Sequence, residues 1–298
     1  MESPASGRVG LWTAALDALD VPAARDMVAE LDEQGWGSLW FGEAYGREAF
    51  TAAAVYLAAS SRMTVGTGIA SIYARDAMAT AGAARTLAAA FPGRFLLGLG
   101  VSHAPLVERM RGHDYGRPVA AMTSYLDALD QAPYLVAGSV EAPPRVLAAL
   151  GPRMLGLARD RAQGAHPYLT TPDHTAHARA VLGGTAENGP LLVVEQAAVV
   201  GDDEHEWRRR AHAHLEVYTG LPNYRASWER QGFTENDAVR GGSERLKSAM
   251  VSRCLEGTAA RVRAHLQAGA TTVVVQVLGQ DMTDVPRTDW TRLAEALL

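Results

Sequence analysis

The chain has 298 residues, of which 48% are hydrophobic and 20% charged, and its formal net charge is −5. This length suits one large α/β barrel or two ordinary domains, and the weak negative charge gives no reason to expect nucleic acid or an anionic membrane as a partner. The single cysteine, Cys254, excludes an intrachain disulfide and is typical of a reducing compartment. Residues 1–7 lack the pattern of a signal peptide and no apolar run is long enough to span a bilayer. We therefore expect a cytoplasmic protein that does not enter a membrane.

Short apolar runs alternate with longer helical patterns along most of the chain. The runs predict eight strands, over residues 8–13, 38–42, 63–72, 95–100, 145–150, 165–169, 191–200 and 271–278. The segments between and after them predict helices, over residues 21–34, 48–60, 77–90, 119–130, 152–163, 172–182, 202–217, 258–268 and 290–298. Strands that are apolar throughout are expected where both faces of a parallel sheet are buried.

This alternation favours a single (β/α)8 TIM barrel over residues 1–298, with a doubly wound open sheet as the competing fold. Residues 218–254 are too long for an ordinary connection after the seventh strand. They carry Tyr224, Trp228 and Phe233. We expect either a lid that carries aromatic residues over a ligand, or a peripheral helical hairpin or dimer contact.

The stretch 92–103 is the fourth predicted strand with its flanking turn and loop. Gly98 and Gly100 permit close approach to the backbone, and we expect them to leave room for a ring system. Ser102 and His103 follow where the strand gives way to a loop, and in a parallel barrel that end usually carries the chemistry. A third glycine is missing, so the dinucleotide-binding pattern is incomplete.

Two other predicted strands end in titratable residues: the second in Glu43 and the sixth in His166. Barrel closure would gather them with His103 around one cavity. A buried carboxylate needs a partner, so Glu43 either acts at the ligand or forms an ion pair with Arg47 or Arg75. No metal-binding motif is present in the sequence, and we expect three further histidines to be solvated: His205, His212 and His214.

Four motifs together resemble the bacterial luciferase-like superfamily: residues 40–43 (WFGE), 66–69 (GTGI), 92–95 (PGRF) and 97–100 (LGLG). Residues 72–76 and 101–105 are similar to an actinobacterial subgroup assigned to the deazaflavin coenzyme F420. The resemblance covers most of the chain. It implies a (β/α)8 barrel with an insertion near the seventh strand, which agrees with residues 218–254.

The resemblance also implies where the cofactor lies. A non-prolyl cis peptide bond at Gly68–Ile69 would form a bulge behind the deazaflavin ring, residues after the fourth strand would hold the cofactor, and the amides after the fifth strand would meet its phosphate. The cofactor-binding residues implied are Gly68, Ile69, Ser71, Val101, Ser102, His103, Ala148, Ala149, Leu150, Gly151, Pro152 and His166.

The sequence departs from related sugar-phosphate dehydrogenases at two points. Ala44 stands where they carry a histidine base, and His103 replaces a glutamate, so their reaction is not carried over. We expect an F420-dependent oxidoreductase that transfers a hydride to or from a small organic molecule, with His103 or Glu43 handling the proton. An FMN-dependent monooxygenase and a non-catalytic flavin-binding barrel remain alternatives. Family members commonly form homodimers, and we expect the same here.

Overall fold

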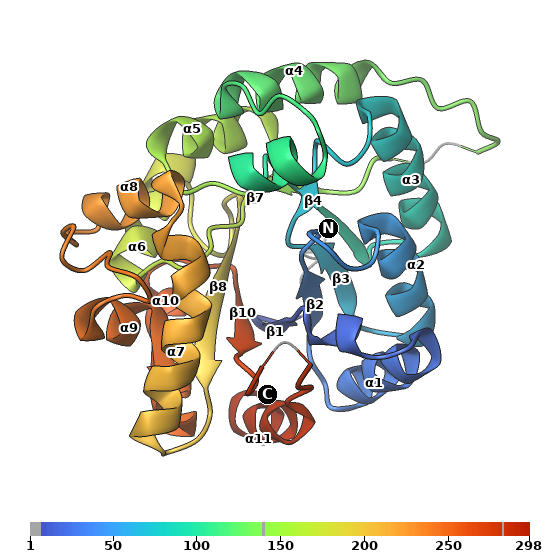
Figure 1. Cartoon of the computed structure of the whole chain (residues 1–298). Helices are drawn as coiled ribbons and strands as arrows, with labels where there is room; N and C mark the ends of the chain where they lie inside the picture. The colour runs from blue at the N-terminus through green and yellow to red at the C-terminus, as the bar shows by residue number, and fades with distance from the viewer. Residues whose placement is uncertain (1–6, 139–140, 282) are drawn as a thin grey trace.

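The computed structural model describes residues 7–138, 141–281 and 283–298. Its parallel strands close into a barrel surrounded by helices (Figure 1). The strands are β1 (Val9–Trp12), β2 (Ser38–Phe41), β3 (Thr64–Thr67), β4 (Ala70–Ser71), β5 (Phe95–Gly100), β6 (Arg145–Leu147), β7 (Gly164–Ala165), β8 (Leu191–Val199), β9 (Val251–Arg253) and β10 (Thr272–Val277).

Eight of these strands form the ring, in the order β1, β2, β3, β5, β6, β7, β8, β10, and β10 pairs in parallel with both β8 and β1. Two lie outside it: β4 pairs with β5, and β9 pairs with β8. The ring confirms the predicted (β/α)8 barrel and rules out the open doubly wound sheet, which would leave two edge strands unpaired.

The helices follow the predicted rhythm closely. They are α1 (Val21–Glu33), α2 (Ala49–Ala59), α3 (Ala77–Ala90), α4 (Pro118–Gln131), α5 (Pro152–Arg161), α6 (Pro172–Leu182), α7 (Glu204–Thr219), α8 (Pro222–Arg230), α9 (Glu244–Met250), α10 (Leu255–Gln267) and α11 (Arg287–Leu297). Side chains cap several N-termini as the sequence indicates; Asp76 accepts from the Ala79 amide and Thr171 from the His174 amide.

The sequence did not predict a 3-10 turn over Ala15–Ala18 or a π-helical segment over Pro105–Met110. The sixth ring strand is also shorter than expected, because only Gly164–Ala165 pair with both neighbours. None of the helices in the described ranges is both long enough and apolar enough to cross a membrane.

Residues 218–254 hold α8, α9 and β9. Tyr224, Trp228 and Phe233 from this insertion pack in one buried cluster with Leu169, from the connection after β7. The insertion therefore packs its aromatic side chains against the segment that follows β7. The lid and its alternatives, a peripheral helical hairpin or a dimer contact, stay predictions. In Figure 1 the helices of the insertion stand beside α7, on the β8 side of the barrel.

The barrel interior is a separate apolar layer. Its inward side chains come from six different strands: Trp12, Trp40, Leu96, Val146, Leu191, Val193 and Val274. Alternate residues of a strand point to opposite faces. A polar residue two positions after one of these inward residues therefore also points inward, and it lies closer to the carboxyl-end mouth of the barrel. That periodicity places the candidate site.

Candidate functional site

The third ring strand is interrupted between β3 and β4, at a cis peptide bond joining Gly68 to Ile69. Gly66 pairs with Leu96 and Ala70 pairs with Leu99. The chain therefore advances four residues from Gly66 to Ala70 while β5 advances three from Leu96 to Leu99. One residue is therefore extra, which defines a β-bulge. The bulge and its cis bond lie where the family resemblance implies them.

Neighbouring strands fix the bulge through backbone groups. The Trp12 indole donates to the Gly68 carbonyl at 2.9 Å, and the Gly68 amide donates to the Phe41 carbonyl at 2.6 Å. The Ile69 carbonyl accepts from the Glu43 amide at 3.1 Å. Both residues of the bulge are half-buried.

The Glu43 carboxylate is fully engaged with protein groups. One oxygen accepts from the Ser71 amide at 2.9 Å, and the other accepts from the Ala49 amide at 3.2 Å and pairs with Arg75. The expected alternative of an ion pair with Arg75 is therefore present. These contacts on both sides of the bulge favour a role for Glu43 in holding Ser71 in place over one in moving a proton.

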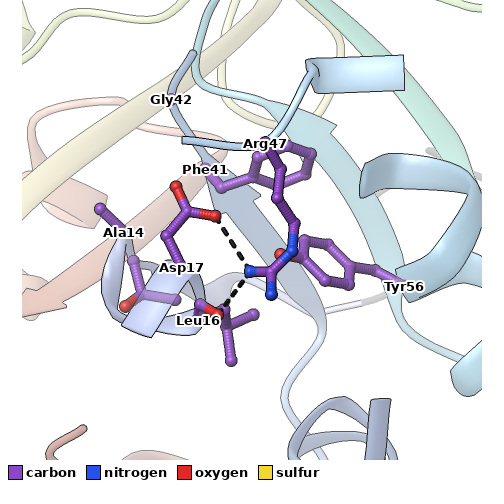
Figure 2. Close-up of a pocket in the computed structure, with 8 residues that line it drawn as sticks. Ala14, Leu16, Asp17, Phe41, Gly42, Arg47 and Tyr56 are labelled. Carbon is purple, nitrogen blue, oxygen red and sulfur yellow. Dashed lines mark hydrogen bonds and ion pairs between the residues drawn. The ribbon is translucent and has the colours of Figure 1, made fainter. Parts of the chain in front are cut away.

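Arg47, the other predicted partner of Glu43, lies elsewhere. Its guanidinium pairs with Asp17 at 3.0 Å and donates to the Leu16 carbonyl (Figure 2). The pocket that these residues line with Tyr56 holds about 10 Å³, which is room for about one water molecule. It is too small for a cofactor or an organic substrate.

The two glycines of β5 do not face an open space. A Cβ on Gly98 would lie 1.8 Å from the Thr67 carbonyl oxygen, and one on Gly100 would lie 2.5 Å from the Ile69 side chain. Our expectation that these two glycines leave room for a ring system is therefore wrong, because protein atoms fill the space beside them. The two glycines let the bulged third strand approach β5, and Ile69 fills the space.

His103 lies in the loop after β5, half-buried, with its ring centroid 5.7 Å from that of Tyr224. Its Nδ1 is buried and has no hydrogen-bond partner within the described ranges. Burial lowers the pKa of His103, so the imidazole is neutral at pH 7. A neutral ring is suited to accept a proton, which argues against the predicted donor role in the resting enzyme.

Val101 and Ser102 stand beside His103 at the same strand end, both half-buried. Ser102 has a φ of 55° and its carbonyl accepts from the Tyr115 hydroxyl at 3.1 Å. Ser71 is fully buried, and its hydroxyl accepts from the Tyr73 amide at 3.3 Å. A ligand could therefore contact Ser71 only through its backbone, or after a small movement of the residues that cover it.

His166 is buried inside the barrel and lies against the bulge. Its Nδ1 is 2.8 Å from the Val193 carbonyl, and its ring centroid is 5.1 Å from that of Trp40. Its Nε2 lies 3.0 Å from where a Cβ on Gly68 would be, and no described residue hydrogen-bonds to it. Burial lowers the pKa of His166 to about 4. It therefore offers a free, neutral ring nitrogen next to Gly68.

The segment from Ala148 to Pro152 joins β6 to α5. Ala149 is buried, Leu150 and Gly151 are half-buried, and α5 begins at Pro152 with no side chain capping it. Pro152 has no amide hydrogen, so the first turn offers an anion the amides of Arg153 and Met154. The Arg230 guanidinium, from α8, lies 3.3 Å from the Leu150 carbonyl and 3.5 Å from where a Cβ on Gly151 would be. The insertion thus brings a positive charge to this helix end.

The structure adds Glu195, which the sequence analysis missed. It lies inside the barrel on β8, is 1% exposed, and has one carboxylate oxygen without a partner in the described part of the chain. Its position two residues beyond Val193, on the inward face, is the signal that could have identified it. Burial raises the pKa of Glu195 to about 8.

Three tyrosines lie over the barrel mouth near Glu195. The Tyr218 hydroxyl donates to Tyr168 at 3.2 Å, and the Tyr224 ring centroid is 4.8 Å from that of Tyr218. His214 joins them, with its ring centroid 5.2 Å from that of Tyr218. The prediction that His214 is solvated is wrong: α7 turns it inward, and burial lowers its pKa to about 4.

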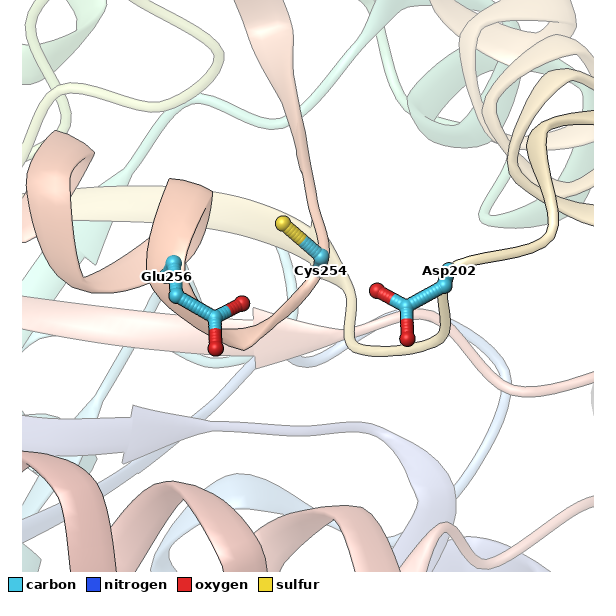
Figure 3. A group of neighbouring side chains, drawn as sticks. All are labelled: Asp202, Cys254 and Glu256. Atoms are coloured by element: carbon cyan, nitrogen blue, oxygen red, sulfur yellow. The ribbon is translucent and has the colours of Figure 1, made fainter.

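Two further features do not include these tyrosines or His214. A groove of about 460 Å³ follows β4 and is lined by residues 72–76, His113 and Asp114. Asp202, Cys254 and Glu256 group their ligand atoms within 4.8 Å of one another (Figure 3). The two carboxylates are exposed, and the Cys254 sulfur accepts from the Gly257 amide at the start of α10.

Enzymes with a parallel (β/α)8 barrel place their active sites at the carboxyl ends of the strands. In this chain the titratable side chains, the bulge and the uncapped start of α5 lie at those ends, so the protein is of the class of (β/α)8 enzymes. More particularly, the chain belongs to the luciferase-like monooxygenase family, whose model matches residues 6–276.

A curated protein is similar to part of this chain. A Mycobacterium tuberculosis protein provisionally named a coenzyme F420-dependent oxidoreductase is 34% identical over 106 residues, which is 36% of this chain and 30% of that protein. The chain thus spans about a third of that relative's length.

Solved structures share the fold over nearly the whole chain. An F420-dependent secondary alcohol dehydrogenase with an F420–acetone adduct superposes with a TM-score of 0.73 at 12% identity, covering 97% of this chain and 98% of that one. The F420-dependent tetrahydromethanopterin reductase of Methanopyrus kandleri gives 0.70 at 16%, covering 98% of each chain. The FMN-bound oxygenating component of 3,6-diketocamphane monooxygenase from Pseudomonas putida gives 0.69 at 12%, also covering 98% of each.

Proposed function

We propose that this protein is an F420-dependent oxidoreductase that moves a hydride between the deazaflavin and a small organic substrate. F420 supplies one chemistry when bound, a hydride exchanged at its C5 position. The residues that would hold it are those around the bulge, Gly68 and Ile69, the loop after β5, and the segment from Ala148 to Pro152. His166 would lie on the barrel side of the bulge.

One observation supports the proposal above the others: the bulge at Gly68 and Ile69 and the uncapped start of α5 both follow ring strands at their carboxyl ends. The uncapped start of α5 and the Arg230 guanidinium are suited to a phosphate group. The free Nε2 of His166 beside Gly68 is a buried polar atom that a bound ring could satisfy. These groups fit a cofactor in which a flexible linker joins a planar ring to a phosphate group.

The choice of F420 over FMN rests on sequence similarity, because both cofactors combine a tricyclic ring with a phosphate. The partial match to the mycobacterial protein named as F420-dependent supports F420. The motifs at residues 72–76 and 101–105 resemble those of the subgroup assigned to F420.

The test is a fluorescence or calorimetric titration of the purified protein with F420 and FMN side by side. We expect F420 to bind with micromolar or tighter affinity and FMN to bind at least ten-fold more weakly. Binding of FMN without F420 would refute the proposal.

The second candidate is an FMN-dependent monooxygenase, favoured by the similar fold of the FMN-bound camphane monooxygenase component. It predicts substrate-dependent oxygen consumption in the presence of reduced FMN, which a deazaflavin enzyme would not show. A barrel that binds flavin without turnover would show neither oxygen consumption nor F420 reduction. An oxygen electrode together with a spectroscopic assay of F420 reduction therefore separates the three alternatives.

A further inference from the structure

Glu195 is a buried acid with an unused oxygen. It follows Val193 by two residues on β8, and Val193 belongs to the interior layer of the barrel. Its side chain therefore points inward, one layer nearer the carboxyl-end mouth. One oxygen accepts from the Leu169 amide at 3.0 Å, while the other, Oε1, has no hydrogen-bond partner in residues 7–138, 141–281 and 283–298. No Lys or Arg of these ranges forms an ion pair with it.

The groups that face Glu195 are neutral. Tyr168 follows β7, Tyr218 belongs to α7 and Tyr224 to α8, and the charge of an ionised Glu195 would raise the pKa of each. His214 and His103 contact these rings, and burial lowers the pKa of both. An ionised carboxylate here would have no positive charge to stabilise it. The carboxyl group is accordingly protonated at pH 7.

The strand that carries Glu195 reaches the bulge through His166. The carbonyl of Val193, two residues before Glu195 on the same face of β8, lies 2.8 Å from Nδ1 of His166, and Nε2 of that ring lies 3.0 Å from where a Cβ on Gly68 would be. Tyr168, over the barrel mouth, reaches the bulge as well. The Tyr168 hydroxyl donates to Gln276 at 2.5 Å, and its ring centroid is 5.4 Å from that of Trp12. Trp12 in turn donates to the Gly68 carbonyl. Glu195 and the bulge therefore share contacts with the interior face of the barrel, and we place the substrate between them.

The two acid–base groups predicted from sequence are less suited to donate a proton. Glu43 is occupied by Arg75 and two backbone amides, and the resting His103 is neutral. Reduction of a carbonyl by hydride needs one proton for the oxygen, and a protonated carboxyl can supply it. Among these three residues, only Glu195 combines a free oxygen with a proton to give.

We propose that Glu195 donates the proton that accompanies hydride transfer to the substrate. This deepens the proposed function and rests on it. As the new C–H bond forms from the hydride of reduced F420, the Glu195 O–H bond breaks and the substrate oxygen gains the proton. The substrate is reduced, the cofactor is oxidised and gives its remaining proton to solvent, and the Glu195 carboxylate regains a proton from solvent. In the opposite direction the same carboxylate accepts the proton of an alcohol.

The experiment is infrared difference spectroscopy of the protein, because a protonated carboxyl has a C=O stretch that a carboxylate lacks. We expect a band at pH 7 that disappears with a midpoint near pH 8 in the protein without cofactor. Glu195→Gln removes the band but keeps an oxygen for the Leu169 amide, so the fold is retained. Glu187→Gln, an exposed residue, is the matched control and keeps the band.

The same band is then compared between the complexes with F420 and with F420 reduced by borohydride. A donor at the reacting centre will show a shifted band between the two complexes, and Glu195→Gln will bind F420 within about two-fold of wild type. An ionised Glu195 at pH 7, or a band unchanged by the redox state of F420, would overturn the proposal.

Failure of the two proposals is distinguishable. If F420 does not bind at all, the proposed function fails and the donor role fails with it. The titration without cofactor still reports the protonation state of Glu195 in that case. If F420 binds but the band does not respond, only the donor role is lost.

Discussion

Replacing Gly98 with alanine should destabilise the barrel strongly, because the third strand and β5 leave no space between them. A Cβ at this position would lie 1.8 Å from the Thr67 carbonyl oxygen, whereas ordinary contacts begin near 3.4 Å. The clashing atom belongs to the backbone, so a side-chain rotation cannot relieve it. The two strands would have to separate by more than an ångström next to the bulge.

The expected magnitude follows from two costs. Overpacking a core costs about 1–3 kcal/mol. Strand separation would also weaken the bonds that the Thr67 hydroxyl makes to Gly98, accepting from its amide at 2.9 Å and donating to its carbonyl at 2.8 Å; each contributes about 1 kcal/mol. Gly98→Ala should therefore lower the free energy of unfolding by about 3–5 kcal/mol. For a chain of 298 residues this corresponds to a fall in Tm of roughly 6 °C.

The assay is urea unfolding followed by circular dichroism, with thermal melts alongside. The matched control is Gly82→Ala in α3, where a Cβ would meet nothing within 4 Å. The same chemical change there should stabilise the protein by about 0.5–1 kcal/mol, because alanine favours a helix over glycine. If Gly98→Ala unfolds within about 1 kcal/mol of wild type, the close approach of the two strands is not what fixes the bulge.

Three further predictions test the site and the core. Arg230→Gln should weaken F420 binding about ten-fold but leave the deazaflavin nucleoside without phosphate unaffected, whereas Arg240→Gln, an exposed arginine of the same insertion, changes neither. Asp32→Asn should cost about 3 kcal/mol in urea unfolding, since the carboxylate accepts from the amides of residues 61–63. Acid should unfold the protein early, because burial lowers the pKa of four histidines to between about 3 and about 4: His166, His174, His214 and His265.

The sign of that acid effect follows from linkage. The folded state holds these histidines neutral, so their contribution to stability is complete above pH 6.5 and falls by about 1.4 kcal/mol per pH unit for each histidine below it. The raised pKa of Glu195 works in the opposite sense from about pH 8 down to its unfolded value of 4.5. It cancels one of the four histidines below pH 6.5 and adds some stability between pH 7.5 and pH 6.5, so a net loss remains at pH 5.0. Urea midpoints at pH 7.5 and pH 5.0 measure the difference, and equal midpoints would contradict the burial of these rings.

The alternation of apolar strands and helices could be predicted from sequence because periodicity reports local burial. Helix ends were also predictable where a capping side chain precedes them, as at Asp76 and Thr171. The bulge at Gly68–Ile69 came from the family resemblance, since no local pattern identifies a peptide bond geometry. The aromatic residues of the insertion were singled out from sequence as one of two alternatives, but their partners on α7 and after β7 were not predictable, because these segments meet only in three dimensions.

Short-range patterns in the sequence were enough to predict the class of barrel and the residues at most strand ends. Motif similarity was enough to predict which strand carries the bulge. Only the tertiary structure shows which groups these residues contact and how deeply they are buried. It engaged Glu43 with Arg75, filled the space at Gly98 and Gly100 with the third strand, and buried His214. It also brought Arg230 to the start of α5 and buried Glu195 inside the barrel, where desolvation raises its pKa. These outcomes depend on desolvation and on contacts between segments far apart in the chain, which no local pattern encodes.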